Sequence, residues 1–221
     1  MNKILETKPK FPVLNNEYFL LRHGESFANR EGIIISDPET GTKTYGLTGQ
    51  GMDHIIHGAI NTRLDNNTII YSSDFLRAKE TAETFASIID AKLMTLTPVL
   101  RERYFGEWEG TATSNYQTIW TADELNNHAE NTTVESVYSV ASRIMEFIHY
   151  LEDTHKHEKI LLVSHGDILQ ILMTASVGSC PSLHRLITPI KTGEIRVLNS
   201  NQLGQFKPKL SSSVIAEKEI A

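Results

Sequence analysis

The 221-residue sequence has a single cysteine, Cys180, so it cannot form an internal disulfide bond. A chain without disulfides suits a reducing compartment. Its first ten residues are charged throughout and contain no apolar stretch of the kind that a secretion signal needs. No apolar run approaches the roughly 20 residues that cross a membrane as a helix. These absences predict a cytoplasmic protein with no membrane partner.

Positive charge is also in short supply. The chain has 21 lysines and arginines against 27 aspartates and glutamates, which gives a net charge of −6 at pH 7. Nucleic-acid binding needs a basic face, so nucleic acid is not an expected partner. A small anionic substrate remains compatible with this charge, because two arginines in one pocket can oppose the overall sign.

The pattern of apolar residues predicts one α/β domain over residues 1–221, with a polar lead-in over 1–16 and a loose tail over about 209–221. Predicted strands and helices alternate along the chain, which is typical of a three-layer α/β/α sandwich with a mostly parallel central sheet. The predicted strands are 18–21, 68–72, 92–96 and 159–164, with a terminal hairpin over 195–206; the predicted helices are 49–64, 73–89, one from Thr132 to about 151, and 167–177.

Local signals mark where two of these helices begin. Thr48 is a candidate N-cap for the first helix. Thr132 and Glu135 have the spacing of a capping box, which predicts that the third helix starts there. Before Thr48, residues 24–47 carry glycines and an Asp-Pro pair, which indicate a long loop. A loop of this length in a compact domain is usually functional or mobile.

Two apolar stretches end in the same way, and this repetition indicates an active site. Residues 18–21 lead into Arg22-His23-Gly24, and residues 159–163 lead into Ser164-His165-Gly166. Open α/β sheets bind ligands beyond the carboxyl ends of their strands. If the two strands are adjacent, His23 and His165 face each other at that edge. The residues alone leave open which histidine attacks a substrate.

Arg77 lies in the first turn of a predicted helix that follows a strand, so we expect it near the same edge of the sheet. A phosphate ester carries nearly two negative charges at neutral pH, and two arginines are suitable bidentate partners for its oxygens. A neutral imidazole can attack phosphorus without a metal ion. The leaving alkoxide needs a proton, which calls for a carboxylic acid with a raised pKa.

The sequence resembles the histidine phosphatase superfamily, also called the phosphoglycerate mutase-like family. Four motifs carry the resemblance and occur in order: Arg22-His23-Gly24-Glu25-Ser26 with Asn29 behind it, the stretch Ser73 to Ala82, the stretch Leu100 to Gly110, and Ser164-His165-Gly166. The resemblance implies the phosphoglycerate mutase-like fold and a phosphatase that hydrolyses a small phosphomonoester through a phosphohistidine, with no metal and no cofactor.

The resemblance also implies roles for individual residues. As catalytic residues it points to the nucleophile His23, the acid Glu102, the clamps Arg22 and Arg77, and the second-side donor His165. As phosphate-binding residues it points to Arg22, Asn29, Arg77, His165 and Gly166.

Other interpretations of these residues remain. Glu102 is flanked by two arginines and could belong to a solvated ion pair, in which case Glu107 or Glu109 could be the acid. A phosphoglycerate mutase and a silent phospho-ligand binding module are alternative functions. His54 and His57 are spaced for a metal but have no third ligand at matching spacing. Cys180 fails as a cysteine-phosphatase nucleophile, since its arginine stands one position too early.

Overall fold

A computed structural model describes residues 11–198, where five strands form one sheet. The predicted tail over 209–221 and the second half of the predicted terminal hairpin lie outside the described residues. The strands are β1 (Glu17–Arg22), β2 (Ile69–Ser72), β3 (Leu93–Leu96), β4 (Lys159–Ser164) and β5 (Ile195–Leu198). Their order across the sheet is β3-β2-β4-β1-β5. The first four run parallel, and β5 pairs antiparallel with β1 at the edge.

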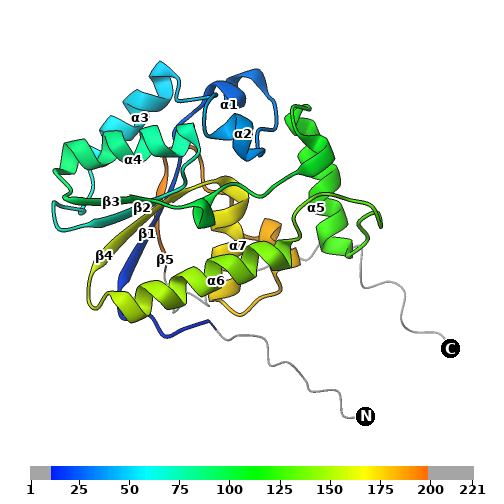
Figure 1. Cartoon of the computed structure of the whole chain (residues 1–221). Coiled ribbons are helices and arrows are strands. Elements are labelled where there is room, and N and C mark those ends of the chain that lie inside the picture. Colours follow the sequence, from blue (N-terminus) through cyan, green and yellow to red (C-terminus); the bar gives the residue numbers. More distant parts are fainter. Residues whose placement is uncertain (1–10, 199–221) are drawn as a thin grey trace, which may run out of the picture.

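Helices cover both faces of the sheet, as Figure 1 shows, so the predicted three-layer α/β/α architecture is confirmed. One face carries α3 (Gly49–Ile60) and α4 (Leu76–Ile89), and the other carries α6 (Val137–Thr154) and α7 (Gly166–Ser176). Shorter helices lie in the connections: α1 (Phe27–Glu31), α2 (Pro38–Gly41), α5 (Tyr116–Leu125), and the 3₁₀ helices η1 (Pro98–Leu100), η2 (Gly106–Trp108), η3 (Thr113–Asn115) and η4 (Pro181–Leu186).

Strand β1 is buried on both faces because it lies between two other strands and two layers of helices. Successive side chains of a strand point to opposite faces. Tyr18 and Leu20 therefore join the core under α6 and α7, whereas Phe19 and Leu21 join the core under α3 and α4. A continuous apolar run is the pattern expected of a strand buried in a parallel sheet.

The register of β1 against β4 brings the two His-Gly sequences together. Arg22 pairs with Ser164, so His23 and His165 are the next residues along two parallel neighbours. The backbone N–H of His23 donates to the carbonyl of Ser164 at 3.0 Å. The predicted adjacency of the two strands is therefore confirmed.

Two local predictions need correction. The segment predicted as a long loop contains the short helices α1 and α2, capped by Ser26 and Asp37. The predicted capping box at Thr132 and Glu135 is wrong, because α6 begins later, with Ser136 as its N-cap.

The two residues of that predicted box have other partners. The Thr132 hydroxyl donates to the carboxylate of Glu107, and the Glu135 carboxylate pairs with Arg143. Both side chains therefore make tertiary contacts and do not cap α6.

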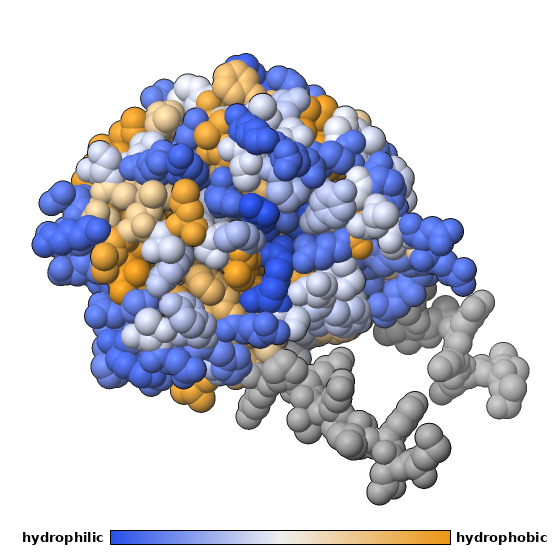
Figure 2. Space-filling view, in the orientation of Figure 1, coloured by the Kyte–Doolittle hydropathy of each residue, from blue (hydrophilic) through white to orange (hydrophobic). Residues whose placement is uncertain are grey.

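The surface in view is mixed in hydropathy (Figure 2), and the described helices lack what a membrane span requires. Figure 2 shows hydrophilic residues over most of the face in view, including its middle, with exposed hydrophobic residues in smaller groups among them. None of the helices within residues 11–198 combines the length and the apolar character that a membrane span requires.

Candidate active site

His23 lies directly beyond β1, and its ring is almost fully buried. Its Nδ1 is 2.7 Å from the carbonyl oxygen of Gly24, so Nδ1 carries the proton and donates it to that carbonyl. The Arg77 Nε–H donates to His23 Nε2 at 3.2 Å. Nε2 therefore holds a lone pair. Burial lowers the pKa of His23 well below its usual value, and Arg77 and Arg22 lower it further, so the ring is neutral at physiological pH.

Gly24 lets helix α3 come close to this histidine. A Cβ at Gly24 would lie 2.9 Å from the carbonyl oxygen of Gly51 in the first turn of α3. Its backbone N–H donates to the Thr81 hydroxyl of α4 at 3.1 Å. Any larger residue at position 24 would push α3 away from the loop that fixes His23.

His165 is the N-cap residue of α7 and is fully buried. The centroids of the His23 and His165 rings are 5.1 Å apart, so the two imidazoles face each other as predicted. His165 Nε2 is 2.9 Å from the hydroxyl of Ser73, and its Nδ1 has no hydrogen-bond partner among the described residues. Burial lowers the pKa of His165 as well, followed by the charge of Arg77.

Two arginines flank the histidines with nitrogen atoms that lack partners. Arg22 donates through one terminal nitrogen to the carbonyl of Ile190, and Arg77 donates to the carbonyl of Ile35. Arg22 Nε, Arg77 Nη1 and His165 Nδ1 are buried with no hydrogen-bond partner among residues 11–198. Buried donors of this kind are rare in proteins and are usually satisfied by a ligand or water. Their grouping beside His23 is what an anion-binding site requires.

Glu102 follows η1 in a partly buried loop. The pKa of its carboxyl group is raised to about 7, first by burial and then by the negative charge of Asp167, while the charges of Arg77 and Arg22 act in the opposite direction. A carboxyl group with this pKa is close to half protonated at neutral pH. It can therefore both donate and accept a proton there.

The two arginines beside Glu102 are paired elsewhere, so the interpretation of Glu102 as their ion-pair partner is not supported. Arg101 makes a bidentate pair with Asp74 at 2.7 and 2.6 Å. Arg103 makes one with Asp123 at 2.6 and 2.8 Å, and both of those side chains are buried.

The two competing carboxylates are also occupied. Glu107 accepts hydrogen bonds from Thr132 and Thr133, and the Thr133 hydroxyl does most to lower the pKa of Glu107, to about 2. Glu109 accepts from both the backbone and the hydroxyl of Ser36 at 2.7 Å. The low pKa of Glu107 means that it holds no proton to donate at neutral pH.

Asn29 and Gly166 take different positions at the site. The Asn29 side-chain oxygen accepts from the backbone and the hydroxyl of Ser26, which caps α1, and Asn29 is exposed. Gly166 opens α7, and a Cβ there would lie 3.5 Å from the guanidinium carbon of Arg22. Gly166 thus packs against the arginine, whereas Asn29 serves a helix end.

The remaining histidine and cysteine alternatives are exposed residues. His54 and His57 are exposed on α3, and no group of three or more potential metal ligands occurs within residues 11–198. Cys180 is exposed and precedes η4.

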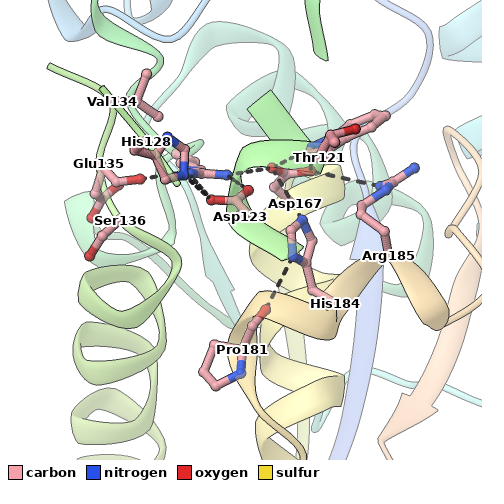
Figure 3. Close-up of polar contacts among 12 residues, drawn as sticks. Thr121, Asp123, His128, Val134, Glu135, Ser136, Asp167, Pro181, His184 and Arg185 are labelled. Carbon is pink, nitrogen blue, oxygen red and sulfur yellow. Dashed lines mark hydrogen bonds and ion pairs between the residues drawn. The ribbon is translucent and has the colours of Figure 1, made fainter. Parts of the chain in front are cut away.

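A buried cluster beside the site was not predicted from the sequence. Figure 3 shows Asp167 at its centre, with His184 and Arg185 around it. Both oxygens of Asp167 accept from the indole N–H of Trp120 at 3.1 Å. Arg103, His184 and Arg185 lie 3.6, 3.7 and 3.8 Å from the same carboxylate.

One sequence signal for this cluster was available. Asp167 follows Ser164-His165-Gly166 directly, so a carboxylate next to the second histidine motif was visible. The contribution of α5 and η4 was not visible, because it depends on how those two elements pack beside α7.

The chain is similar in sequence and fold to known phosphatases and to a phosphoglycerate mutase-like protein. The model of the histidine phosphatase superfamily (branch 1) matches residues 18–206. The chain is 29% identical over 165 residues to a metal-independent phosphoserine phosphatase of Arabidopsis thaliana, a match covering 71% of this chain and 66% of that protein. It is 29% identical over 179 residues to phosphoglycerate mutase-like protein 4 of the same plant, covering 77% and 75%. A solved phosphoserine phosphatase from Entamoeba histolytica superposes with a TM-score of 0.68 at 24% identity, covering 82% of this chain and 89% of that one.

Proposed function

The chain belongs to the histidine phosphatase superfamily, and from that premise we propose how its own residues divide the work of hydrolysis. Members of this class transfer a phosphoryl group to a histidine and then to water, and this protein is a phosphomonoester hydrolase of that type. The observation that carries the proposal is the set of three buried, unpartnered nitrogen atoms beside the neutral ring of His23.

In the first step, His23 Nε2 attacks phosphorus. The hydrogen bond from His23 Nδ1 to the Gly24 carbonyl fixes the tautomer that leaves Nε2 unprotonated. This bond also orients the ring toward the site and stabilises the positive charge that develops on the imidazole during attack. The new P–N bond forms as the bond between phosphorus and the leaving oxygen breaks.

Arg22, Arg77 and His165 hold the transferred phosphoryl group. Arg22 Nε, Arg77 Nη1 and His165 Nδ1 supply donors to its oxygens, and the two guanidinium groups oppose its charge. Because these groups are already buried and fixed, they need little rearrangement as charge shifts in the transition state. Gly166 lies against the guanidinium of Arg22 at the start of α7.

Glu102 protonates the leaving oxygen in the first step. In the second step its carboxylate takes a proton from a water molecule, which attacks the phosphohistidine and breaks the P–N bond. A pKa of about 7 suits both roles at neutral pH. Since the arginines and His165 provide the electrostatic stabilisation, we propose that the cycle runs without a metal ion.

The proposed substrate is a small phosphorylated metabolite, of the kind named for the plant relative, phosphoserine. We further propose that the described elements form a single domain and that the protein acts in the cytoplasm, where its one cysteine stays reduced.

An alkaline-quench experiment tests the assignment of His23. The protein is mixed with labelled p-nitrophenyl phosphate and quenched in alkali, because phosphohistidine survives in base and is lost in acid. We expect the label on the peptide that contains His23. His23→Ala should abolish labelling and turnover, whereas the matched control His54→Ala, at an exposed histidine of α3, should behave as the unmodified protein does. Label on His165 would reverse the assignment.

A further inference from the structure

A row of contacting aromatic rings, called the aromatic wall below, consists of Phe105, Tyr116 and Trp120 and ends at Arg185. The rings of Phe105 and Tyr116 meet edge to face with centroids 4.9 Å apart. Tyr116 stacks on Trp120 at 5.1 Å with an interplanar angle of 7°, and the Arg185 guanidinium lies over the Trp120 ring at 3.6 Å. Tyr116, Trp120 and Arg185 are all only partly buried, so this wall borders solvent.

The near end of the wall adjoins the catalytic groups. Burial raises the pKa of the Tyr116 hydroxyl, the negative charges of Glu102 and Asp167 raise it further, and Arg77 and Arg22 lower it. The charges of the proposed acid and of both arginines therefore act on Tyr116, whose ring contacts Phe105 in the loop that also contains Glu102. Its stacking on Trp120 continues the wall to Arg185.

Arg185, at the far end of the wall, lies in η4, a few residues before a backbone group that contacts Arg22. The chain after Arg185 reaches Ile190, whose carbonyl accepts the hydrogen bond from Arg22. The charges of Arg22 and Glu102 both act on the pKa of Arg185, after the larger effects of burial and Asp167. Arg185 thus shares one electrostatic environment with the groups that would hold the phosphoryl group.

Arg185 keeps donors that no group within the described part of the chain uses. Among residues 11–198, only the side-chain oxygen of Gln170 accepts a hydrogen bond from it. Its distance of 3.8 Å from Asp167 is an ion-pair separation rather than a hydrogen bond. Figure 3 shows the guanidinium at the outer edge of the cluster, with one nitrogen facing Asp167 and another directed away from it. Its side chain is 28% exposed.

Asp167 does not need Arg185 as its main partner. The Trp120 indole donates to both carboxylate oxygens at 3.1 Å, and the fully buried Arg103 is nearer than Arg185, at 3.6 Å. An arginine fork on an aromatic face beside a catalytic pocket is a common arrangement for recognising a carboxylate or a phosphate.

We propose that Arg185, presented on Trp120, binds a second anionic group of the substrate, so that the preferred substrates are small phosphomonoesters that also carry a carboxylate or another phosphate. This inference rests on the proposed function and deepens it, because it adds a subsite at the opposite end of the substrate from His23.

Three esters of equal chain length test the subsite: 3-hydroxypropyl phosphate, with a neutral end; 3-(phosphonooxy)propanoate, with a carboxylate; and propane-1,3-diyl bisphosphate, with a second phosphate. The measured quantity is kcat/KM for each anionic ester divided by kcat/KM for the neutral ester. A charge-assisted hydrogen bond predicts a ratio of about 10 to 100 for at least one anionic ester. The carboxylate and phosphate esters distinguish the two sources of the anion.

Two substitutions at Arg185 show whether it causes the preference. Arg185→Met removes the charge but keeps an apolar stem over Trp120, and it should bring the ratio close to one. Arg185→Lys keeps the charge without the planar fork and should give an intermediate ratio. The matched control is Arg63→Met, because Arg63 is exposed, pairs with Glu17 at the start of β1, and lies over Phe19. It should leave the ratio unchanged.

Several results would overturn the proposal. A ratio near one in the unmodified protein would show that there is no subsite. An equal loss of kcat/KM for all three esters in Arg185→Met would show that Arg185 only supports the structure. If Arg185→Met does not fold, the ratio in Arg185→Lys and the fall of the ratio with added salt in the unmodified protein decide the question. Hydrolysis of p-nitrophenyl phosphate by the unmodified protein distinguishes the two proposals. If the protein hydrolyses this ester but shows no preference for anionic esters, only the subsite proposal fails. If it does not hydrolyse this ester, the proposed function fails and the subsite proposal fails with it.

Discussion

Substitution of Glu102 by glutamine gives a direct measure of what the raised pKa contributes. An ordinary glutamate, with a pKa of 4.5, is about 0.3% protonated at pH 7. With its pKa raised to about 7, Glu102 is about half protonated at that pH. The environment therefore increases the population of the acid form by about 150-fold. Glu102→Gln keeps the size and hydrogen-bonding ability of the side chain but removes the proton that the proposed acid would donate.

The expected effect depends on the leaving group. An alkyl alkoxide needs a proton in the transition state, and general acid catalysis typically contributes about 10²–10⁴-fold. Phosphoenzyme formation from an alkyl phosphate should therefore slow by about that factor in Glu102→Gln. A nitrophenolate leaves readily without a proton, so the same step with p-nitrophenyl phosphate should slow much less.

The pH dependence follows from the direction of the shift. Because the pKa of Glu102 is raised, the acid form is present below about pH 7 and is lost as the pH rises through that value. Phosphoenzyme formation from an alkyl phosphate should fall above about pH 7 in the unmodified protein. That fall should be absent in Glu102→Gln.

Rapid-quench measurement of a single turnover isolates this first step. The isolation is needed because dephosphorylation should slow with both substrates, since the same carboxylate activates water. Equal slowing of the first step for both substrates would mean that Glu102 only positions other groups. Persistence of the alkaline fall in Glu102→Gln would assign the titration to another residue, and Glu109 would be tested next.

Four further outcomes follow from the same geometry. Asp167→Asn should lower the pKa of Glu102 and move the alkaline limb of kcat/KM to lower pH; an unmoved limb would show that Asp167 does not tune the acid. Asp123→Ala leaves the buried Arg103 without its bidentate partner and should lower the free energy of unfolding in urea by about 3–5 kcal/mol. As a control, Glu39→Ala breaks the exposed pair with Lys43 and should lower it by at most about 1 kcal/mol. Similar losses in the two variants would contradict the argument that the buried pair matters more. Turnover should persist in excess EDTA, and its loss would contradict the metal-free cycle. With 3-phosphoglycerate the protein should release phosphate, whereas efficient conversion to 2-phosphoglycerate with little free phosphate would establish the mutase alternative.

The strands and the two histidines could be predicted because their signals are local. Each of the two central strands is a short apolar run that ends in His-Gly, and parallel strands present their carboxyl ends at one edge. His23 and His165 could be set side by side on that basis. The assignment of the nucleophile needed more, because both motifs look alike. The proposal that His23 attacks is supported by the Gly24 carbonyl, which fixes one tautomer, and by Arg77, which donates to Nε2.

The features that the sequence did not reveal depend on partners far away in the chain. The capping-box spacing at Thr132 was misleading because its hydroxyl donates to Glu107, so a tertiary contact took the side chain that the local pattern assigned to the helix. The short helices α1 and α2 did have local signals, in Ser26 before Asn29 and in the Asp37-Pro38 pair, but the glycines around them favoured a loop. Arg185 over Trp120 joins η4 to α5 and has no local signature.

The strand order also determines when the protein becomes active during its synthesis. The unit β2-α4-β3 is contiguous in sequence and can assemble early, since local contacts form fastest. Strand β1 is made first but takes its place only between β4 and β5, which are made last. We therefore expect a growing chain that already contains His23 and Arg77 to be inert, because neither the second histidine nor the burial that keeps His23 neutral exists yet. Ribosome-bound chains that end before β4 should show no partial activity, and activity should appear in one step once β4 and β5 have left the exit tunnel.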